Sequence, residues 1–493
     1  MTDLGEPIVI GQGTFGCVHK PQMKCIGQKR TDASIVSKLM GRDDANDELR
    51  EFALIQKADT KEEYYLGLPQ DCNIDNLYDL NKIAISNCSG FDANKINQYK
   101  LLLMKYGGKD LLNFGEDVLK LKKTPDNIHK IELFWLEVSR LFRGIHVFNK
   151  AGIVHHDLKH PNIVYDEKTR RINFIDFGFM TNKTDIINLC KSSDYWLSKQ
   201  MHWSFPFEII LWNKDTYSKY ANGTVSKLAK DFATVSLDMS KPTGNLFHAI
   251  TDFKPNTPEY KRLSENMFKQ FFRMSMDLDI KGYEDFLNKS VDTVDSYGLG
   301  IALMYMLRKS RHLLQRDFST KVFSLFQNMI HPNVYSRHDT NTLMNEYEGI
   351  LSEHGFLTKH NMRFDNHKLV SGNELPISIE KTVSKMVHDV NQISKEDINA
   401  MSPYDEPIRI CPEGKEYKRH TKRCVKTCKS GYMRDGNFKC VKDTHRKTVK
   451  KCPAGKQLNP NTNRCRDICP PGKIRNDKNR CVKLQDNPFS INM

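Results

Sequence analysis

Long hydrophobic runs are missing from this sequence of 493 residues. No stretch of about 18 apolar residues occurs, so no membrane-spanning helix is predicted. The first residues, from Met1 to Glu6, contain neither a basic stretch nor an apolar core, and no secretory signal is expected. These two absences predict a soluble protein that stays in the cytoplasm or in a compartment reached from it.

A net charge is also missing from most of the chain. The segment from Cys411 to the end holds 22 Lys and Arg against 7 Asp and Glu, which leaves 53 basic and 53 acidic residues in the first 410 positions. The whole net charge of +15 therefore lies in the tail. A neutral body argues against nucleic-acid binding by that part, whereas the basic tail suits nucleic acid, acidic protein or anionic lipid as a partner. A soluble basic arm without a partner is the alternative.

Cysteine is sparse in the body of the chain. Cysteines scattered in this way are expected to be reduced, mostly inert thiols of a cytosolic protein. The five are Cys17, Cys25, Cys72, Cys88 and Cys190.

The other eight cysteines form an internal repeat in the tail. Four of them recur with a constant shift of 41 residues, which predicts two Cys-rich basic repeats over 411–485. Disulfide-stapled modules are favoured, with 105 possible pairings, and reduced thiols in a flexible arm are the alternative. Zinc binding is disfavoured because no Cys-x-x-Cys pair occurs. The repeated set is Cys411, Cys424, Cys428 and Cys440, followed by Cys452, Cys465, Cys469 and Cys481.

The order of the predicted elements indicates the fold class. The length exceeds one ordinary compact core, so two or three units are expected. Short apolar runs alternate with turns up to about residue 110, and helical apolar spacing follows over 130–150 and over about 292–355. This order predicts an α+β body with a small sheet-rich lobe and a larger helical lobe. The polar residues 356–405 are expected to be a linker with room for one helix.

A glycine-rich segment follows the strand-like residues 8–10. Its glycines let a backbone approach phosphate groups, whose oxygens can then face the N–H groups of the loop, while the valine would cover an adenine. An ordinary hairpin turn is the alternative, and a dinucleotide-binding fold is disfavoured because no helix follows at once. The candidate nucleotide-binding residues are Gly11, Gly13, Thr14, Phe15, Gly16 and Val18.

A lysine on the next strand-like run completes the candidate phosphate site. Lys38 can bridge two phosphates if a carboxylate holds it in place. Glu51 is preferred as that partner, because Leu54 and Ile55 would face inward on the same helix, and Glu48 is the alternative. Any one of these charges could instead be a solvated surface group.

The most specific segment is a loop before a strand, with an aspartate followed by a lysine two positions on and an asparagine five positions on. Asp157 can accept the proton of a substrate hydroxyl, and Lys159 can neutralise a γ-phosphate. Asn162 and the later Asp176, in an Asp-Phe-Gly sequence, can bind a metal ion. Positioning and charge neutralisation are the main needs of phosphoryl transfer.

These segments, in this order and at this spacing, resemble the eukaryotic-type protein kinase family over residues 6–355. The resemblance implies a bilobal kinase fold, with an N-terminal lobe over about 6–105 and a C-terminal lobe over about 106–355. It also implies ATP and Mg²⁺ as cofactors and a protein substrate. The Asp-Leu-Lys-x-x-Asn form of the loop is typical of serine/threonine kinases.

Further positions match the family residue by residue. The segment ending at Glu208 resembles the close of an activation segment, and Arg337 resembles the arginine that pairs with that glutamate. Asp295 resembles the buried aspartate that anchors the catalytic loop. The resemblance places the adenine contacts in the hinge, at Met104, Lys105 and Tyr106.

The chain departs from the family pattern at two places. His156 stands where the family usually has an arginine that receives an activation-loop phosphate, so control by phosphorylation is in doubt. An insertion over about 209–292 is expected beside the substrate groove. It could bind substrate, regulate the activity, or be a surface addition without a functional role.

The narrower resemblance is to kinases of large nucleocytoplasmic DNA viruses, which would imply action in a host cytoplasm and packaging in virions. The expected activity is serine/threonine phosphorylation. The alternative is a catalytically idle kinase fold that acts as a scaffold through its basic repeats.

Overall fold

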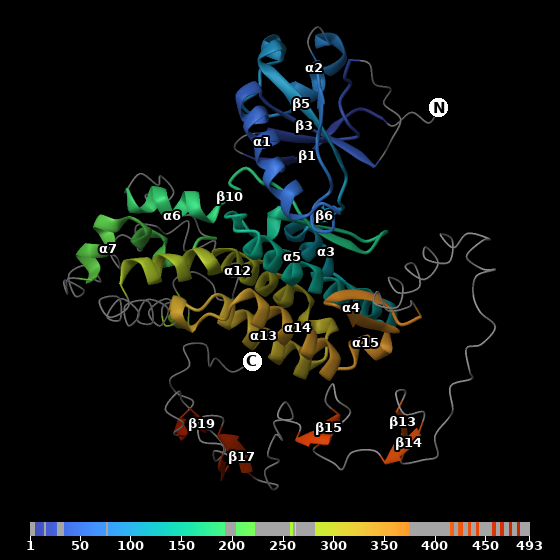
Figure 1. The fold of residues 1–493 in the computed structure, drawn as a ribbon. Helices are drawn as coiled ribbons and strands as arrows, with labels where there is room; N and C mark the ends of the chain where they lie inside the picture. The colour runs from blue at the N-terminus through green and yellow to red at the C-terminus, as the bar shows by residue number, and fades with distance from the viewer. Residues whose placement is uncertain are drawn as a thin grey trace, which may run out of the picture. The chain divides into compact units, whose positions relative to one another are not determined.

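The computed structural model divides the chain into two compact units, Met1–Glu374 and Leu375–Met493. The first unit contains a sheet-rich N-terminal part and a helical part (Figure 1), which agrees with the predicted α+β class. The described residues are 5–13, 16–26, 34–74, 77–192, 204–221, 257–259, 262, 282–373, 415–418, 423–426, 432–434, 440–442, 456–459, 464–467, 473–475 and 481–483.

A five-stranded antiparallel sheet forms the N-terminal part, in the order β1-β2-β3-β5-β4. The central strand β3 is rich in apolar residues on both faces, and it places Lys38 opposite Val18 of β2 and Leu102 of β5. Helix α1 follows β3 directly and carries a buried apolar stripe. The elements are β1 (Ile8–Gln12), β2 (Gly16–Lys20), β3 (Ile35–Gly41), α1 (Arg42–Ala58), β4 (Gln70–Cys72), α2 (Tyr78–Ser86), η1 (Ala93–Gln98) and β5 (Tyr99–Lys105).

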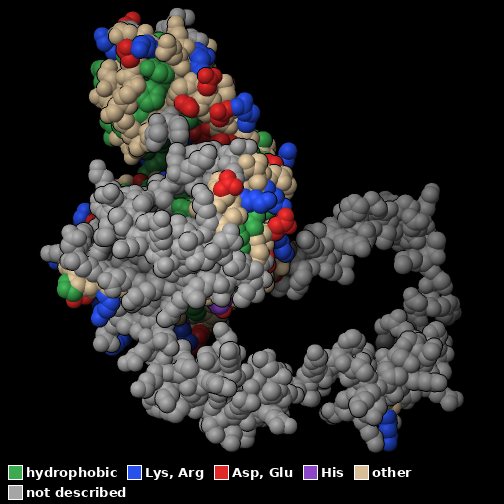
Figure 2. Space-filling model, turned by 90° about the vertical axis from the view of Figure 1, so that its left-hand side faces the viewer, with side chains coloured by type: hydrophobic (Ala, Val, Ile, Leu, Met, Phe, Trp, Pro, Cys, Tyr) green, Lys and Arg blue, Asp and Glu red, His purple; other side chains and the backbone are tan. Residues whose placement is uncertain are grey.

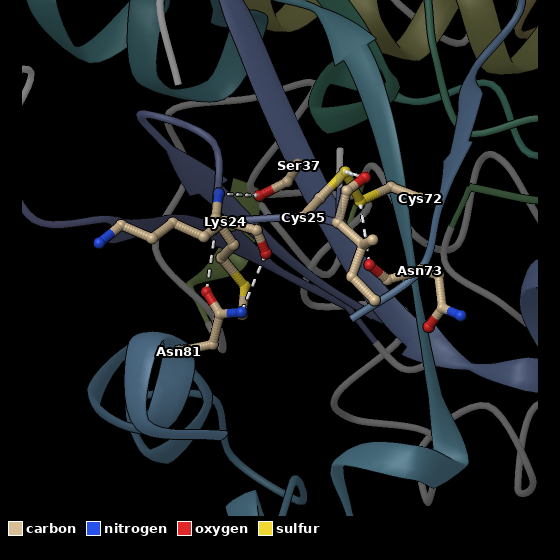
Figure 3. Close-up of a disulfide and its surroundings, with 8 residues drawn as sticks. Lys24, Cys25, Ser37, Cys72, Asn73 and Asn81 are labelled. Atoms are coloured by element: carbon tan, nitrogen blue, oxygen red, sulfur yellow. Dashed lines mark hydrogen bonds between the residues drawn. A yellow bond between two sulfur atoms is a disulfide. The ribbon is translucent and has the colours of Figure 1, made fainter. Parts of the chain in front are cut away.

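Two disulfides correct the expectation that the body cysteines are reduced. Cys17 is bonded to Cys88, and Cys25 is bonded to Cys72 (Figure 3), whereas Cys190 is a free buried thiol. The pairs lie 71 and 47 residues apart in the chain, so no sequence spacing signals them. Cys88 meets Cys17 because the segment between β4 and β5 folds back on β2, whereas Cys72 of β4 meets Cys25 in the segment after β2.

The helical part is built around the long helix α12, most of whose side chains are buried. It packs against α3 and α13, and α14 packs against α5 with Phe142 stacked on Tyr347. Local signals set the helix starts: Thr124 caps α4 ahead of a proline at its first position. The helices are α3 (Leu111–Leu119), α4 (Pro125–Glu137), α5 (Ser139–Lys150), α6 (Lys183–Lys191), α7 (Lys214–Ala221), α12 (Tyr283–Ser310), α13 (Arg316–Met329), α14 (Thr340–Glu353) and α15 (Phe356–Lys359).

Short strands and single turns of 3-10 helix connect these helices and shape the loops near the two candidate aspartates. The order of the three-stranded sheet is β6-β8-β9, and β7 pairs with β10. These elements are β6 (Lys109–Asp110), β7 (Ile153–Val154), η2 (His160–Asn162), β8 (Ile163–Asp166), β9 (Arg171–Phe174), β10 (Thr181–Asn182), η4 (Phe207–Trp212), η5 (Arg311–Leu313) and η6 (Val334–Ser336).

The body extends beyond residue 355, which corrects the predicted start of the linker. Helix α15 is followed by a hairpin of β11 (Met362–Asp365) and β12 (Lys368–Ser371). Glu132 of α4 accepts hydrogen bonds from Lys359 at 2.7 Å and His360 at 2.9 Å. Polar composition concealed this element, whose charged side chains also pair with the body at His367–Glu348 and Lys368–Glu63.

The second unit consists, in its described residues, of four two-stranded hairpins. Each strand of the first two hairpins recurs 41 residues later, in keeping with the sequence repeat. Bonding of the tail cysteines, and most of the 209–292 insertion, lie outside the described residues. The strands are β13 (Lys415–Lys418), β14 (Arg423–Lys426), β15 (Tyr432–Arg434), β16 (Cys440–Lys442), β17 (Lys456–Asn459), β18 (Arg464–Asp467), β19 (Lys473–Arg475) and β20 (Cys481–Lys483).

Acidic and basic side chains are interspersed on the described part of the face that Figure 2 shows, and neither charge forms a continuous patch there. This fits the neutral charge of the first 410 residues. None of the described helices is long and apolar enough to cross a membrane.

Candidate active site

Asp157 lies in the loop between β7 and η2 and is only 5% exposed. Its carboxylate accepts hydrogen bonds from Lys159 Nζ, at 2.9 and 2.8 Å, and from the side-chain amide of Asn162, at 2.9 Å. Asn162 also donates to the backbone carbonyl of Asp157 at 2.8 Å. The three residues that the sequence grouped therefore form one hydrogen-bonded cluster. Because the amide nitrogen of Asn162 points to Asp157, its amide oxygen is the atom left to bind a cation.

Asp295 of helix α12 holds the backbone of this loop in place. The buried carboxylate of Asp295 accepts the backbone N–H groups of His155 and His156, both at 2.8 Å. Three residues further along α12, a Cβ on Gly298 would come within 2.3 Å of the Leu158 carbonyl oxygen, so glycine allows the close approach. His156 adopts a left-handed backbone, with φ of 67°, that is rare for such a residue and persists where the surroundings enforce it.

Asp176 follows β9 and also has a left-handed backbone, with φ of 61°. Its backbone neighbour Ile175 donates to the carbonyl of Asn162 at 3.0 Å, so the loops that carry Asp157 and Asp176 are joined. Protein surrounds Asp176, yet its side chain stays 45% exposed. Although burial alone would raise the pKa of Asp176, the positive charges of Lys38 and Lys159 hold it below its usual value. Asp176 is therefore an ionised carboxylate that remains accessible to a ligand.

Lys38 pairs with Glu48, which corrects the preference for Glu51. The Lys38 Nζ lies 2.5 Å from Glu48 and 3.5 Å from Asp176. Burial lowers the pKa of Lys38, but the negative charges of Asp176 and Glu48 outweigh it and raise the pKa above its usual value. The buried positions of α1 are Ala45, Glu48, Phe52 and Ile55, so the helical period places Glu48 on the inward face.

Glu51 stands next to this pair without joining it. Its Oε2 atom is buried and has no hydrogen-bond partner among the described residues. Burial, with the nearby charges of Glu48 and Asp176, raises the pKa of Glu51 from 4.5 to about 7. A carboxyl group in this position prefers to be protonated in the folded chain.

We expect Glu51→Gln to stabilise the protein at pH 8. The folded state favours protonated Glu51. The stability that this protonated form contributes is fully present below pH 4.5 and is lost as the pH rises through about 7. Allowing for partial exposure, the variant should gain about 1–2 kcal/mol at pH 8 and almost nothing at pH 5. Urea unfolding at both pH values measures this difference. An equal effect at both would contradict the assigned pKa.

The glycine-rich hairpin is described at its three glycines, whereas Thr14 and Phe15 lie outside the described residues. A Cβ on Gly11 or Gly13 would meet nothing within 4 Å, so space remains beside this backbone. Gly16 differs, because its Cβ would lie 2.9 Å from the Leu39 carbonyl oxygen. Val18 is opposite Lys38 in the β2–β3 register, so both side chains are on the same face of the sheet.

The residues predicted to form the hinge lie at the end of β5 and directly after it. Met104 is opposite Val36 of β3, on the sheet face that also carries Lys38. The Tyr106 N–H donates to the Ser34 carbonyl at 2.6 Å. The prediction that Tyr106 presents backbone groups to adenine can therefore hold only for its carbonyl, while Lys105 remains a candidate.

Aromatic packing links the candidate catalytic residues to both parts of the fold, and sequence reasoning missed it. Phe177, after Asp176, packs edge-on against Phe52 of α1 at 5.2 Å and lies 5.1 Å from the ring of His155. Phe52 lies four residues after Glu48, so both share one helix face. The spacing of four residues was therefore the sequence signal both for the Lys38–Glu48 pair and for the packing of Phe52 against Phe177.

The segment that precedes the insertion is held by a buried ion pair. The two terminal guanidinium nitrogens of Arg337 donate to Glu208, at 2.6 and 3.0 Å, and the two side chains are 1% and 0% exposed. Just before Glu208, Phe205 packs against His156 at 5.3 Å, and Trp212 lies equally close to the imidazole. Burial lowers the pKa of His156 to about 3, so the imidazole is neutral here.

Comparison with known proteins supports a relationship to protein kinases. The chain is 26% identical over 217 residues to cyclin-dependent kinase B2-1 from Oryza sativa subsp. japonica. This match covers 41% of the chain and 57% of the rice protein, so the chain spans little more than half the length of that relative. The chain matches no protein-family profile.

Proposed function

We propose that the protein is a serine/threonine protein kinase that transfers the γ-phosphate of ATP to protein hydroxyls. One observation carries the proposal: Lys38 on the sheet contacts Asp176, 138 residues later in the chain, beside the cluster of Asp157, Lys159 and Asn162. Phosphoryl transfer needs cations at the phosphates, a metal-binding carboxylate and a base for the hydroxyl, and these residues supply them together.

In this proposal Asp157 orients the acceptor hydroxyl and takes its proton as the oxygen bonds to the γ-phosphorus, while the bond from that phosphorus to ADP breaks and ADP leaves. Lys159 holds the Asp157 carboxylate through two hydrogen bonds before substrate arrives and neutralises charge on the transferred phosphoryl group. Lys38, held by Glu48, positions the phosphates of ATP. The adenine would lie against the sheet face of Val18 and Met104.

The donor set fits Mg²⁺, because the carboxylate of Asp176 and the amide oxygen of Asn162 are hard oxygen ligands. The exposed, ionised state of Asp176 leaves it able to bind a cation. When bound, Mg²⁺ would neutralise phosphate charge. Asp176 and Asn162 are the residues that would hold it.

Glu48→Gln should reduce phosphate transfer by about 10- to 100-fold, because Lys38 loses the carboxylate that fixes its position. Most of the loss should appear with ATP as the varied substrate, as a raised KM together with a lowered kcat. Steady-state kinetics measure both constants. The matched control is Glu51→Gln on the same helix, which should retain nearly full activity. If the control loses more activity than Glu48→Gln, the assigned pairing is wrong.

Two finer proposals rest on the sequence alone. The likeness to kinases of large DNA viruses supports action in a host cytoplasm, with virions as a further location. The basic repeats support an acidic partner for the tail. An idle scaffold is the competing function, but every proposed phosphate, metal and base position is filled.

Phosphoamino-acid analysis tests the proposed activity. The full chain is incubated with labelled ATP, Mg²⁺ and a generic basic protein, and the labelled protein is hydrolysed. We expect phosphoserine and phosphothreonine. Phosphotyrosine alone would contradict the acceptor class, and no transfer despite firm ATP binding would favour the scaffold.

A further inference from the structure

Helix α2 and the turn after it lie along β2 and reach the glycine-rich hairpin. We define residues 78–90 as the α2 clamp. At one end, Asn81 exchanges two hydrogen bonds with the backbone of Lys24 (Figure 3), at 3.0 and 2.9 Å. Further along, the His19 imidazole lies 3.0 Å from the Ala84 carbonyl oxygen. The clamp therefore follows β2 from the segment beyond its end back toward the hairpin.

At its other end, the clamp holds both strands of the glycine-rich hairpin. Cys88 is bonded to Cys17, the residue directly after Gly16. The next residue, Ser89, exchanges two hydrogen bonds with the side-chain amide of Gln12, which stands between Gly11 and Gly13. Gln12 and Cys17 are opposite each other in the β1–β2 register. One turn of the clamp thus contacts the two positions that flank the phosphate-binding loop.

Of these contacts, the disulfide is the one that holds the hairpin firmly. The Gln12–Ser89 hydrogen bonds are exposed, and exposed hydrogen bonds exchange with water at little net cost. Gly11 and Gly13 have open space where a side chain would begin, so their own packing restrains the loop little. A covalent bond at Cys17, by contrast, limits how far β2 can move from the clamp.

We propose that the Cys17–Cys88 pair is a redox-sensitive site through which the α2 clamp controls the order of the glycine-rich hairpin and, resting on the proposed function, the affinity for nucleotide. Two thiols are oxidised to the disulfide with loss of two protons and two electrons. A low-molecular-weight disulfide such as oxidised glutathione accepts them and leaves as two thiols. Cys17 and Cys88 are 0% and 2% exposed, so exchange requires the clamp to open locally.

The Cys25–Cys72 disulfide provides the matched control. It joins the segment after β2 to β4, and Cys72 pairs with Leu101 of β5, away from the hairpin. Each cross-link joins a strand of the sheet to a segment outside the strands, and the two close loops of 71 and 47 residues. Cys88→Ser and Cys72→Ser therefore each remove one disulfide, but only Cys88→Ser releases the hairpin. Neither residue belongs to the proposed catalytic or nucleotide-binding set.

The first measurement is peptide mapping of the full chain after incubation with oxidised glutathione, without reductant. We expect a cross-linked peptide pair containing Cys17 and Cys88. Recovery of both as free thiols would overturn the proposal. Stoichiometric zinc bound through Cys17, His19 and Cys88, whose ligand atoms lie within 4.8 Å of one another, would overturn it as well.

The second measurement is amide hydrogen exchange of the peptide covering residues 8–20, without nucleotide. Reduced wild type and Cys88→Ser should exchange about tenfold faster than oxidised wild type, whereas Cys72→Ser should match oxidised wild type. Equal exchange in Cys88→Ser and oxidised wild type would overturn the clamp. This readout does not depend on any kinase activity.

The third measurement is the affinity for a fluorescent ATP analogue. Reduction or Cys88→Ser should weaken binding about fivefold or more, and Cys72→Ser should not. If the affinity for the ATP analogue is unchanged while amide hydrogen exchange of the hairpin is faster, the proposed effect on nucleotide binding is wrong, but the proposed effect of the clamp on hairpin order stands. No binding by any form would instead count against the proposed function.

Discussion

Asp157→Asn should lower the rate of phosphate transfer by about 10²- to 10⁴-fold, the contribution expected of a positioned general base. Asparagine cannot accept the hydroxyl proton, and it lacks the negative charge and the second acceptor oxygen that hold Lys159, which lies 2.8–2.9 Å from both carboxylate oxygens. The KM for ATP should change little, because the Asp157 carboxylate is hydrogen-bonded to Lys159 and Asn162, which are not residues of the proposed adenine site. Steady-state kinetics with ATP and a basic protein substrate measure both effects.

The control for this variant is Asp126→Asn at the exposed first turn of α4. It makes the same chemical change far from the Asp157 cluster in the chain and should leave the rate unaltered. Thermal unfolding of both variants separates lost chemistry from lost structure. A rate for Asp157→Asn within a few-fold of the wild type would show that another group takes the proton.

Arg337→Ala should destabilise the first unit by about 3–5 kcal/mol, because it leaves the buried charge of Glu208 without its partner. Both side chains are almost fully buried, and Ser290 is the other donor to the Glu208 carboxylate, at 3.3 Å. The effect should be visible in urea unfolding as a lower midpoint at an unchanged slope.

Two further variants make this second prediction specific. Arg50 forms an ion pair with Asp47 on exposed α1 positions, and Arg50→Ala should cost less than about 1 kcal/mol. Replacing both members of the buried pair, as Arg337→Met with Glu208→Leu, should recover part of the loss, since no uncompensated charge remains. A loss no larger for Arg337→Ala than for Arg50→Ala would contradict the account of the pair.

The order of strands and helices along the chain could be predicted because the sequence signals for each element are local. The apolar runs of β1 and β3, and the loop that carries Asp157, are read directly from neighbouring residues. The partner of Lys38 was harder, because Glu48 and Glu51 differ by less than one helical turn. Burial of Phe52 four residues after Glu48 decides between them, and burial depends on tertiary packing.

The disulfides and the hairpin after α15 could not be predicted for a different reason. Cys17 and Cys88 become neighbours only when the α2 clamp folds onto β2. The scattered spacing of the body cysteines therefore looked like that of free thiols. Similarly, Glu132 reaches Lys359 and His360 across more than 220 residues, and nothing local marks those residues as part of the body.

His156, which replaces the arginine expected from the resemblance to protein kinases, is surrounded by aromatic side chains. The neutral imidazole packs between Phe205 and Trp212, at the position where the sequence comparison with protein kinases expects a phosphate-binding arginine. Aromatic contacts can thus hold the end of this segment without a phosphate. The redox state of the α2 clamp is the alternative form of control that the structure offers.

The most direct test of the proposed kinase activity compares two labels in one assay. Wild type and Asp157→Asn are each incubated with Mg²⁺, a basic protein and ATP labelled at either the γ- or the α-phosphate. The account predicts transfer of the γ-label by wild type, almost none by Asp157→Asn, and no transfer of the α-label. Equal γ-label transfer by both proteins, or transfer of the α-label, would contradict it.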